Sequence, residues 1–364
     1  MKFRCERDVL VEALNTAARA ASARGGSPVL SGVRLELRDD QLAATGTDLD
    51  LTITTSVSVS GESDGVAVLP AKLATDIVKV LEHGAVDLSV SNDEAVIDSG
   101  RSHFSVRTIP AEEFPRVPEP AGDGVTIDAK ALAEALRQVV SAASTDDSRP
   151  ILTGVLMAAE ASGLRLVATD SYRLAVRDLP GTSFLSEGQS VLVPSSALKE
   201  LNRVLGQADE VTLRLGERDA AFQLGSVHLT TRLIEGEFPP YRNLIPAQQP
   251  NRLTVSRDGL LEAVRRVRVV ASDPSTPVRL TMREDGLELH ATAQDIGNAS
   301  EQLDAKYEGA ELTVAFNPEY LLAGIDAATG DEITLETVDA LKPALLRSID
   351  VAEFLYLLMP VRVS

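Results

Sequence analysis

Aspartates recur at the ends of two predicted strands, in Thr47-Asp48 and Thr169-Asp170, and Gln294-Asp295 is a looser third copy. Carboxylates that lie close together can act as a general acid and a general base. A chain with 54 aspartates and glutamates among 364 residues, however, brings carboxylates together by chance. Because an active site rarely needs three copies in one chain, we interpret these aspartates as residues of structural turns.

The sequence lacks the motifs that bind phosphate, activate a serine or hold zinc on a helix, namely G-x-x-x-x-G-K-[ST], G-x-G-x-x-G, G-x-S-x-G and H-E-x-x-H. The lone Cys5 excludes an internal disulfide and a cysteine-based metal or redox motif. The histidines are scattered without the spacing of metal ligands, at His83, His103, His228 and His290. We therefore expect no catalytic residue, metal or cofactor, and an enzyme of unknown type remains the alternative from another class.

The composition is typical of a soluble globular protein, with 44% hydrophobic and 24% charged residues. No apolar run is long enough to span a membrane, and Met1–Glu6 lacks the apolar core of a signal peptide, so we expect a cytoplasmic protein. The net charge of −19 argues against a protein that coats nucleic acid by bulk attraction. It does not exclude a protein whose positive charge is confined to one surface.

Three landmarks recur along the chain, which indicates an internal repeat. The second and third of them repeat every 124 residues, and the prolines of the first are 122 and 127 residues apart. The first is Ser27–Val33, matched by Arg149–Val155 and more loosely by Thr276–Leu280; the second is Leu69-Pro70, Val193-Pro194 and Asn317-Pro318; the third is Phe114–Pro118 and Phe238–Arg242. We predict three tandem domains, residues 1–121, 122–249 and 250–364.

Each domain is predicted to be α+β and doubled, with a strand, an amphipathic helix and three alternating strands in each half. The whole chain would then hold six helices and about eighteen to twenty-four strands. The helical windows are 8–24, 71–83, 128–142, 195–206, 257–268 and 318–328. Their core faces are the apolar stripes Leu10/Leu14/Ala17, Leu73/Ile77/Val80, Leu132/Leu136/Val139, Leu198/Leu201/Leu205, Leu261/Val264/Val267 and Leu321/Ile325.

Two segments carry a more specific signal, Ala168–Ala175 (A-T-D-S-Y-R-L-A) and the C-terminal Tyr356–Ser364 (Y-L-L-M-P-V-R-V-S). With the period of 124 residues, they closely resemble the bacterial DNA polymerase III beta subunit, the sliding clamp, over the whole chain. The resemblance implies a non-catalytic processivity factor made of three DNA-clamp domains. These domains form half of a ring, with helices inside and sheets outside.

The number of helices bears on the ring that the resemblance implies. Six packed helices about 9 Å apart would enclose a circle only about 17 Å across, whereas twelve give about 34 Å. Since a duplex is roughly 20 Å across, one chain cannot encircle it but a homodimer can. The resemblance assigns the head-to-tail contact to Arg101 and Phe104 on one side and Val270 on the other.

The charge of the helices suggests which residues face double-stranded DNA. The six windows total +1, so the rest of the chain carries −20. A weakly positive bore attracts the duplex without base readout and without stopping its sliding. The candidate phosphate neighbours are Arg24, Arg137, Arg149, Lys199, Arg203, Arg265, Arg266 and Arg268.

The resemblance also implies a hydrophobic cleft that binds short linear peptides of the DNA polymerase III alpha subunit, the clamp loader, other polymerases and repair factors. The matching residues are Leu152, Thr169, Ser171, Tyr172, Arg173, Leu174, Pro239, Asn243, Leu244, Asn317, Tyr320, Leu341, Leu357, Met359, Pro360, Val361 and Arg362. Without the resemblance, Tyr356–Val363 is interpreted as a buried C-terminal strand, whereas Pro360 within that run favours an edge, beside which a peptide could lie. Ser171-Tyr172 departs from the Gly-His of many members, so a clamp duplicate with an altered, inhibitor-insensitive pocket is the alternative function.

Overall fold

The computed structural model describes residues 1–22, 27–115, 124–182, 185, 188–206, 208–271, 273 and 276–362. The fold divides into two compact units. The first unit comprises Met1–Lys130 and Arg203–Leu233, and the second comprises Ala131–Asn202 and Ile234–Ser364. Because this division runs through the predicted second domain, the three domain boundaries remain a prediction.

Six helices are present in the part of the chain that the structure describes, each near a predicted window. They are α1 (Arg7–Ala18), α2 (Ala71–Val80), α3 (Ala129–Val139), α4 (Ser195–Leu205), α5 (Arg257–Arg268) and α6 (Pro318–Ala327). The window 8–24 was too long, because after Ala18 the chain turns so that the N–H of Ser22 donates to Leu30 O at 2.8 Å. The prediction of six helices is otherwise confirmed.

Every helix follows one strand and precedes three, as the doubled βαβββ pattern predicts. Before and after α1 and α2 lie β1 (Lys2–Glu6), β2 (Gly32–Arg38), β3 (Gln41–Thr47), β4 (Leu51–Ser58), β6 (Gly65–Pro70), β7 (Ala85–Ser91), β8 (Glu94–Ser99) and β9 (Ser102–Arg107). Around α3 and α4 lie β10 (Val125–Asp128), β11 (Gly154–Glu160), β12 (Gly163–Thr169), β13 (Arg173–Pro180), β14 (Ser190–Pro194), β15 (Glu210–Leu215), β16 (Asp219–Leu224) and β17 (Val227–Arg232).

The third repeat follows the same order. Around α5 and α6 lie β18 (Asn251–Ser256), β19 (Val278–Arg283), β20 (Gly286–Ala293), β21 (Gly297–Leu303), β23 (Leu312–Phe316), β24 (Glu332–Thr337), β25 (Ala344–Ser348) and β26 (Phe354–Leu358). Two short strands, β5 (Ser60–Ser63) and β22 (Ala305–Glu308), lie outside the pattern. The strands of the described ranges therefore slightly exceed the number expected from the sequence.

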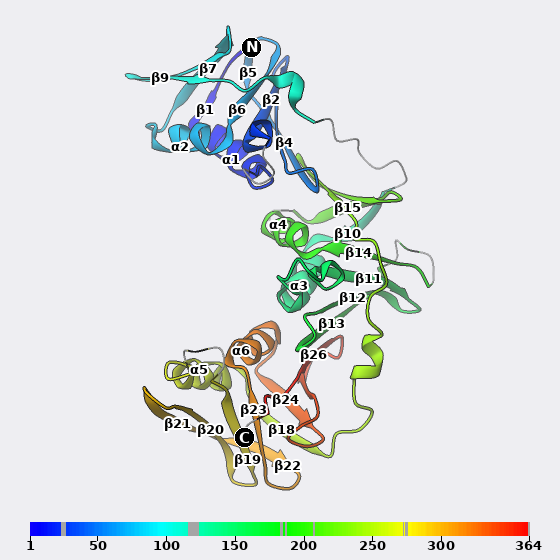
Figure 1. Ribbon diagram of the computed structural model, residues 1–364. Coiled ribbons are helices and arrows are strands. Elements are labelled where there is room, and N and C mark those ends of the chain that lie inside the picture. Colours follow the sequence, from blue (N-terminus) through cyan, green and yellow to red (C-terminus); the bar gives the residue numbers. More distant parts are fainter. Residues whose placement is uncertain are drawn as a thin grey trace. The chain divides into compact units, whose positions relative to one another are not determined.

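The first unit contains a five-stranded sheet, in the order β5-β1-β7-β8-β9, and an eight-stranded sheet, β10-β15-β16-β17-β4-β3-β2-β6. In the larger sheet, β17 of the second repeat pairs with β4 of the first, antiparallel. Helices α1 and α2 pack side by side against these strands (Figure 1). Their core includes Leu10, Leu14, Leu35 and Leu88, all fully buried.

The second unit contains a nine-stranded sheet, β14-β11-β12-β13-β26-β25-β24-β18-β22, and a four-stranded sheet, β21-β20-β19-β23. Strand β26 of the third repeat pairs with β13 of the second, as β17 does with β4. Helix α6 packs onto β26 so closely that a Cβ on Gly324 would lie 2.5 Å from Cδ1 of Tyr356. A glycine is therefore required at this crossing.

The apolar stripes identify the core face of five helices. Leu10, Leu132, Leu198, Val264 and their stripe partners are all buried, as predicted. The stripe on α2 was wrong. Leu73 is 49% exposed and Val80 75% exposed, and the small residues Ala71 and Ala74 are buried instead with Ile77. Val78 is fully buried as well, so the buried face of α2 still has helical spacing, but it lies on another side of the helix than the predicted stripe.

No helix of the described ranges is both long enough and apolar enough to pass through a bilayer.

Candidate functional site

The turn between β12 and β13 is held by its own side chains. The Thr169 hydroxyl donates to Arg173 O at 2.6 Å and accepts from the N–H of Ser171 at 3.1 Å. Asp170 Oδ1 accepts the N–H groups of Tyr172 and Arg173 at 2.9 and 3.0 Å. Ser171 takes a left-handed conformation with φ +81°. This network fixes the turn and presents the side chain of Tyr172, which is 58% exposed.

The first repeat contains the same turn. The Thr47 hydroxyl bonds Leu51 O and the N–H of Leu49, both at 3.1 Å. Asp48 Oδ1 accepts the N–H groups of Asp50 and Leu51 at 3.0 and 2.7 Å, and Leu49 has φ +82°. The two aspartates therefore cap backbone N–H groups, which confirms their interpretation as structural residues.

Asp295 belongs to a different turn, in which the N–H of Ile296 donates to Ala293 O at 3.1 Å. Among the described residues, no three His, Cys, Asp or Glu side chains gather closely enough to hold a metal ion. Burial raises the pKa of the Cys5 thiol to about 12, which leaves it protonated and unreactive near neutral pH.

Arg173 connects the turn to helix α6. Its Nε donates to Asp170 Oδ2 at 2.9 Å, and its Cζ lies 4.5 Å from the centre of the Tyr320 ring. Burial by itself lowers the pKa of Arg173, but Tyr356 and Asp170 outweigh it and hold that pKa above the ordinary value. Arg173 is therefore a fixed cation within the site.

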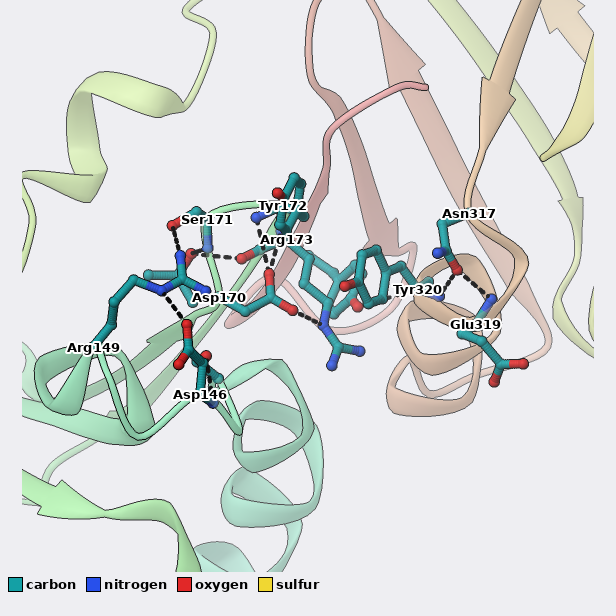
Figure 2. Close-up of polar contacts among 12 residues, drawn as sticks. Asp146, Arg149, Asp170, Ser171, Tyr172, Arg173, Asn317, Glu319 and Tyr320 are labelled. Carbon is teal, nitrogen blue, oxygen red and sulfur yellow. Dashed lines mark hydrogen bonds and ion pairs between the residues drawn. The ribbon is translucent and has the colours of Figure 1, made fainter. Parts of the chain in front are cut away.

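Tyr172 and Tyr320 stack on each other, with ring centres 6.3 Å apart and planes inclined by 22° (Figure 2). Asn317 caps α6, because its Oδ1 accepts the N–H groups of Glu319 and Tyr320 at 2.9 and 3.3 Å. The Tyr356 hydroxyl donates to Tyr320 O at 3.0 Å. The stacked pair thus joins the turn of the second repeat to a helix of the third.

The C-terminal segment continues along the same turn. The N–H of Met359 donates to Tyr172 O at 2.8 Å, and the N–H of Val361 donates to Ala315 O at 2.8 Å. The prediction of an edge strand was wrong, because β26 lies between β13 and β25. Pro360 follows the end of β26 at Leu358, so its missing N–H breaks no bond of the ladder.

Leu174 and Leu357 are opposite each other in the β13–β26 pairing, and both are almost fully buried. They belong to one apolar cluster that also contains Tyr241 and, partly buried, Phe238. Leu152 and Thr169 are 9% and 4% exposed. These four predicted contacts are therefore buried, and accessible surface must come from other residues.

Four of the predicted residues have exposed apolar side chains: Tyr172, Leu244 at 46% exposure, Leu341 at 64% and Met359 at 38%. Leu244 ends the short 3-10 helix η5 (Tyr241–Leu244), where Asn243 is also exposed and Pro239 half-buried. Arg362 is exposed and Pro360 and Val361 are half-buried. Large apolar side chains exposed beside charged ones are typical of a surface that binds a partner.

The predicted DNA contacts are mostly paired with carboxylates. Arg149 bonds Asp146 at 2.9 Å and lies 3.4 Å from the Ser171 hydroxyl, beside the turn. Ion pairs also link Arg265 to Glu262, Arg266 to Glu301 and Arg268 to Glu319. Lys199 and Arg203 are exposed on α4, and Arg24 lies outside the described residues. Their assignment to DNA remains a prediction.

Arg137 has a structural environment that the sequence did not indicate. Besides Glu134, its guanidinium donates to Asp326 O at 2.7 Å and Ala327 O at 3.0 Å, at the C-terminus of α6. The neighbouring Gln138, fully buried, also donates to Ala327 O at 3.0 Å. Arg137 therefore fastens α3 to α6.

Two of the three predicted dimer contacts lie at or beside a sheet edge. Arg101 is exposed beside the edge strand β9, Phe104 is half-buried within it, and Val270 is half-buried after α5. Sequence reasoning missed Asp146, Tyr241 and Tyr356 as neighbours of the peptide site. The Asp-x-x-Arg spacing of Asp146 and Arg149 was a usable signal for the first of these.

Comparison with known proteins covers the whole chain. Family models of the DNA polymerase III beta subunit match in sequence order: the N-terminal domain over residues 1–118, the central domain over 126–240 and the C-terminal domain over 242–362. A beta sliding clamp of Streptomyces coelicolor is 35% identical over 100% of both chains, and one of Synechocystis is 33% identical over 100% and 99%.

Solved structures agree. A sliding clamp of Bartonella birtlesii bound to griselimycin aligns with a TM-score of 0.94 and 34% identity over 100% of both chains. A sliding clamp of Bacillus subtilis aligns with a TM-score of 0.93 and 30% identity over 100% of both. None of these comparisons favours a duplicate with an altered pocket. The chain therefore belongs to the family of DNA polymerase III beta subunits, the beta sliding clamps, which are non-catalytic processivity factors of α+β clamp fold.

Proposed function

We propose that two copies of this chain close head to tail into a ring around double-stranded DNA. Strand β9 is the edge of the five-stranded sheet and β21 is the edge of the four-stranded sheet. An unpaired edge is a template for pairing with another chain. Arg101 lies beside β9 and Arg107 ends it, whereas Asp295 lies just before β21 and Glu301, which pairs with Arg266, lies within it, so basic residues at one edge could meet acidic residues at the other. A heterologous contact of this kind gives a closed ring when it closes after two copies.

The peptide site completes the proposal. The observation that supports it most directly is the meeting of Tyr172, Arg173, Tyr320 and Met359, which come from a turn, a helix and the C-terminal segment. Exposed apolar side chains around a fixed arginine suit a short peptide with apolar residues and one polar anchor. Such peptides would come from the polymerase alpha subunit, the clamp loader and repair factors.

The mechanism is tethering. A ring linked to DNA by topology cannot diffuse away from it, and a polymerase bound through a weak peptide contact keeps a high effective concentration at the primer. The contact with DNA needs only weak, non-specific attraction, because base readout would arrest sliding. The ion-paired arginines of α5 are consistent with such weak attraction.

The ring is tested by solution mass and by retention on DNA after loading. We expect a dimer of twice 38.7 kDa that stays on circular DNA and is lost when that DNA is cut once. Phe104→Asp, on β9, should abolish both dimer and retention, whereas Leu341→Asp should leave both intact. Equal retention on circular and cut DNA would refute the ring.

The peptide site is tested by titration with a labelled peptide from the C-terminus of the polymerase alpha subunit. Tyr172→Ala and Met359→Asp should each weaken binding at least tenfold, which corresponds to about 1.4 kcal/mol. Val80→Asp is the matched control, since Val80 is 75% exposed on α2. Deleting residues 359–364 should weaken peptide binding and leave the dimer intact; loss of the dimer would count against the site.

A further inference from the structure

The first helix of each repeat begins at an equivalent position. The N–H of Arg7 donates to Gly84 O and that of Arg257 donates to Asp331 O, both at 2.8 Å. In both repeats the acceptor directly precedes the strand that follows the second helix. The second repeat has Ala129 at this position, with the same backbone bond. The first and third repeats thus place an arginine where the second has none.

In the first repeat this arginine caps the C-terminus of α2. Arg7 Nε donates to Val78 O at 3.2 Å, and its Nη2 donates to Lys79 O. The last C=O groups of a helix lack regular partners within the helix, and a cation there also interacts favourably with the helix dipole. The Nη1 of Arg7 donates to the neighbouring Asp8 at 2.6 Å. Arg7 therefore satisfies the end of α2 from within its own repeat.

In the third repeat, the end of α6 is capped from the second repeat instead. Asp326 is equivalent to Val78, since each lies eight residues after the proline at the start of its helix. Arg137 donates to Asp326 O at 2.7 Å and to Ala327 O at 3.0 Å, and Gln138 also donates to Ala327 O at 3.0 Å. A carbonyl oxygen has two lone pairs, so Ala327 O has no place for a third donor.

Arg257 is left without the helix bonds that Arg7 makes. Its Nη2 donates to Asp258 Oδ1 at 2.6 Å, as Arg7 donates to Asp8. Its Nε, however, is buried, and no described residue accepts its proton. A buried donor without an acceptor costs free energy, so such a group in a folded protein calls for an explanation. The explanation here is that Arg137 already occupies the carbonyl groups at the end of α6.

The other acceptor of Arg137 also has a second arginine beside it. Glu134 accepts from Nη2 and Nε of Arg137 at 2.7 and 2.8 Å. This bond chiefly lowers the pKa of Glu134, burial opposes the change, and the charge of Arg177 adds to the lowering. Nε and Nη1 of Arg177 are buried, and neither has an acceptor in the part of the chain that the structure describes. Both partners of Arg137 therefore have a substitute donor at hand.

We infer that α3 and α6 form a contact with two states. In the state that the structure shows, Arg137 caps α6 and pairs with Glu134. In the other state Arg137 withdraws, Arg257 caps α6 as Arg7 caps α2, and Arg177 pairs with Glu134. Because the acceptors that Arg137 leaves are taken over, α3 can part from α6 without leaving the helix end uncapped. The second and third repeats can then change their contact at a small cost, and this property requires neither the proposed ring nor DNA.

The test is a double-mutant cycle, measured by native-state hydrogen exchange in the last turn of α6. Arg257→Met alone should change exchange there less than about twofold, because Arg257 makes no bond to α6 in the state shown. Arg137→Met should accelerate exchange roughly threefold more in the Arg257→Met chain than in the chain that keeps Arg257, since no substitute remains. Arg7→Met is the matched control. It should by itself accelerate exchange in the last turn of α2 about tenfold, because Arg7 already holds that helix end.

A crystal structure of the Arg137→Met variant gives a direct readout, and it decides the matter even if the double variant fails to fold. We expect the guanidinium of Arg257 within hydrogen-bond distance of the carbonyl groups that end α6, and Arg177 within hydrogen-bond distance of Glu134. Both arginines in unchanged positions would overturn the inference. So would equal effects of Arg137→Met in the two backgrounds, or a loosening of α6 by Arg257→Met alone as large as that of α2 by Arg7→Met.

Discussion

Replacing Arg137 by methionine tests whether this residue fastens α3 to α6. The substitution keeps most of the length of the side chain and removes the guanidinium. It breaks the bonds to Asp326 O and Ala327 O and the ion pair with Glu134. Arg265 is a matched control, since it makes the same i,i+3 ion pair with Glu262 at 2.7 Å. Both variants remove an i,i+3 ion pair, and Arg137→Met also removes the two hydrogen bonds to the C-terminus of α6.

The free-energy cost of Arg137→Met can be worked out from the contacts that it removes. A hydrogen bond from a charged donor contributes about 1.5–3 kcal/mol, and a cation at a helix C-terminus adds about 0.3–1 kcal/mol. The Arg137 side chain is 38% exposed, so solvent screening reduces both contributions, and Gln138 still bonds Ala327 O after the change. We expect a cost of about 2 kcal/mol for Arg137→Met. For Arg265→Met the exposed ion pair predicts about 0.3–0.5 kcal/mol.

Native-state hydrogen exchange measures the loss of local stability in each helix. A loss of about 2 kcal/mol corresponds to roughly 30-fold faster exchange in the last turn of α6, against about twofold in α5 for Arg265→Met. If both variants accelerated exchange equally, or if α6 were unaffected by Arg137→Met, Arg137 would be an ordinary surface residue. Its assignment as a phosphate neighbour would then regain support.

Acid should reduce the destabilisation that Arg137→Met causes, because the ion pair with Glu134 is absent from both proteins at low pH. The bond from Arg137 lowers the pKa of Glu134 from its ordinary 4.5, although burial opposes this. A carboxylate whose pKa is lower in the folded state contributes stability that is complete above the unfolded pKa and is lost as the pH falls through the folded pKa. The part of the Arg137→Met effect that comes from the ion pair should therefore be full above about pH 5 and fade below pH 4.

Two further pairs of variants test the local geometry. Gly324→Ala should destabilise the second unit by about 1–3 kcal/mol in urea unfolding, because its new methyl group meets the Tyr356 ring, while Gly206→Ala, with open space around its Cβ, should be nearly neutral. Equal effects would show that α6 can shift. Asp170→Asn should cost about 2 kcal/mol or more, since it breaks an ion pair that is largely buried. Asp48→Asn keeps an oxygen that accepts the N–H groups of Asp50 and Leu51 and should cost less than about 1 kcal/mol. Similar urea-unfolding midpoints for Asp170→Asn and Asp48→Asn would refute the claim that only Asp170 holds a buried ion pair.

The sequence predicted the fold well where periodicity determines burial. Leu132, Leu136 and Val139 repeat at helical spacing and all three are buried, because a helix against a sheet has one continuous apolar face. The method failed on α2, where Leu73 and Val80 are exposed and Ala71, Ala74 and Val78 are buried. Choosing the largest apolar residues at helical spacing selected the wrong face of this helix.

The residues of the candidate site could be predicted from the sequence only in part. Tyr172, Arg173 and Met359 were identified because they lie in motifs, and the structure brings them together. A buried strand was the interpretation of the C-terminal run without the resemblance, and the burial of Leu357 agrees with it, but the burial of Leu174 was not foreseen, since a motif shows which residues matter and not which of them reach the surface. The prediction from Pro360 was wrong because this proline lies just after β26, so it does not show whether the strand is at an edge of the sheet.

The repeated turn shows how one framework can support different recognition. Thr47 and Asp48 make the same bonds as Thr169 and Asp170, so the backbone at residues 50 and 172 is fixed in the same way. What differs is the side chain that each turn presents. At the first turn Asp50 is paired with Arg232, and at the second Tyr172 lies on an aromatic ring. Because these side chains add nothing to the bonds that hold the turn, they can change without loss of the fold. The specificity of each junction is therefore expected to follow from the few exposed side chains at positions such as 172 and 359, whereas the buried threonines Thr47 and Thr169 and the N–H-capping aspartates fix the geometry of the turns.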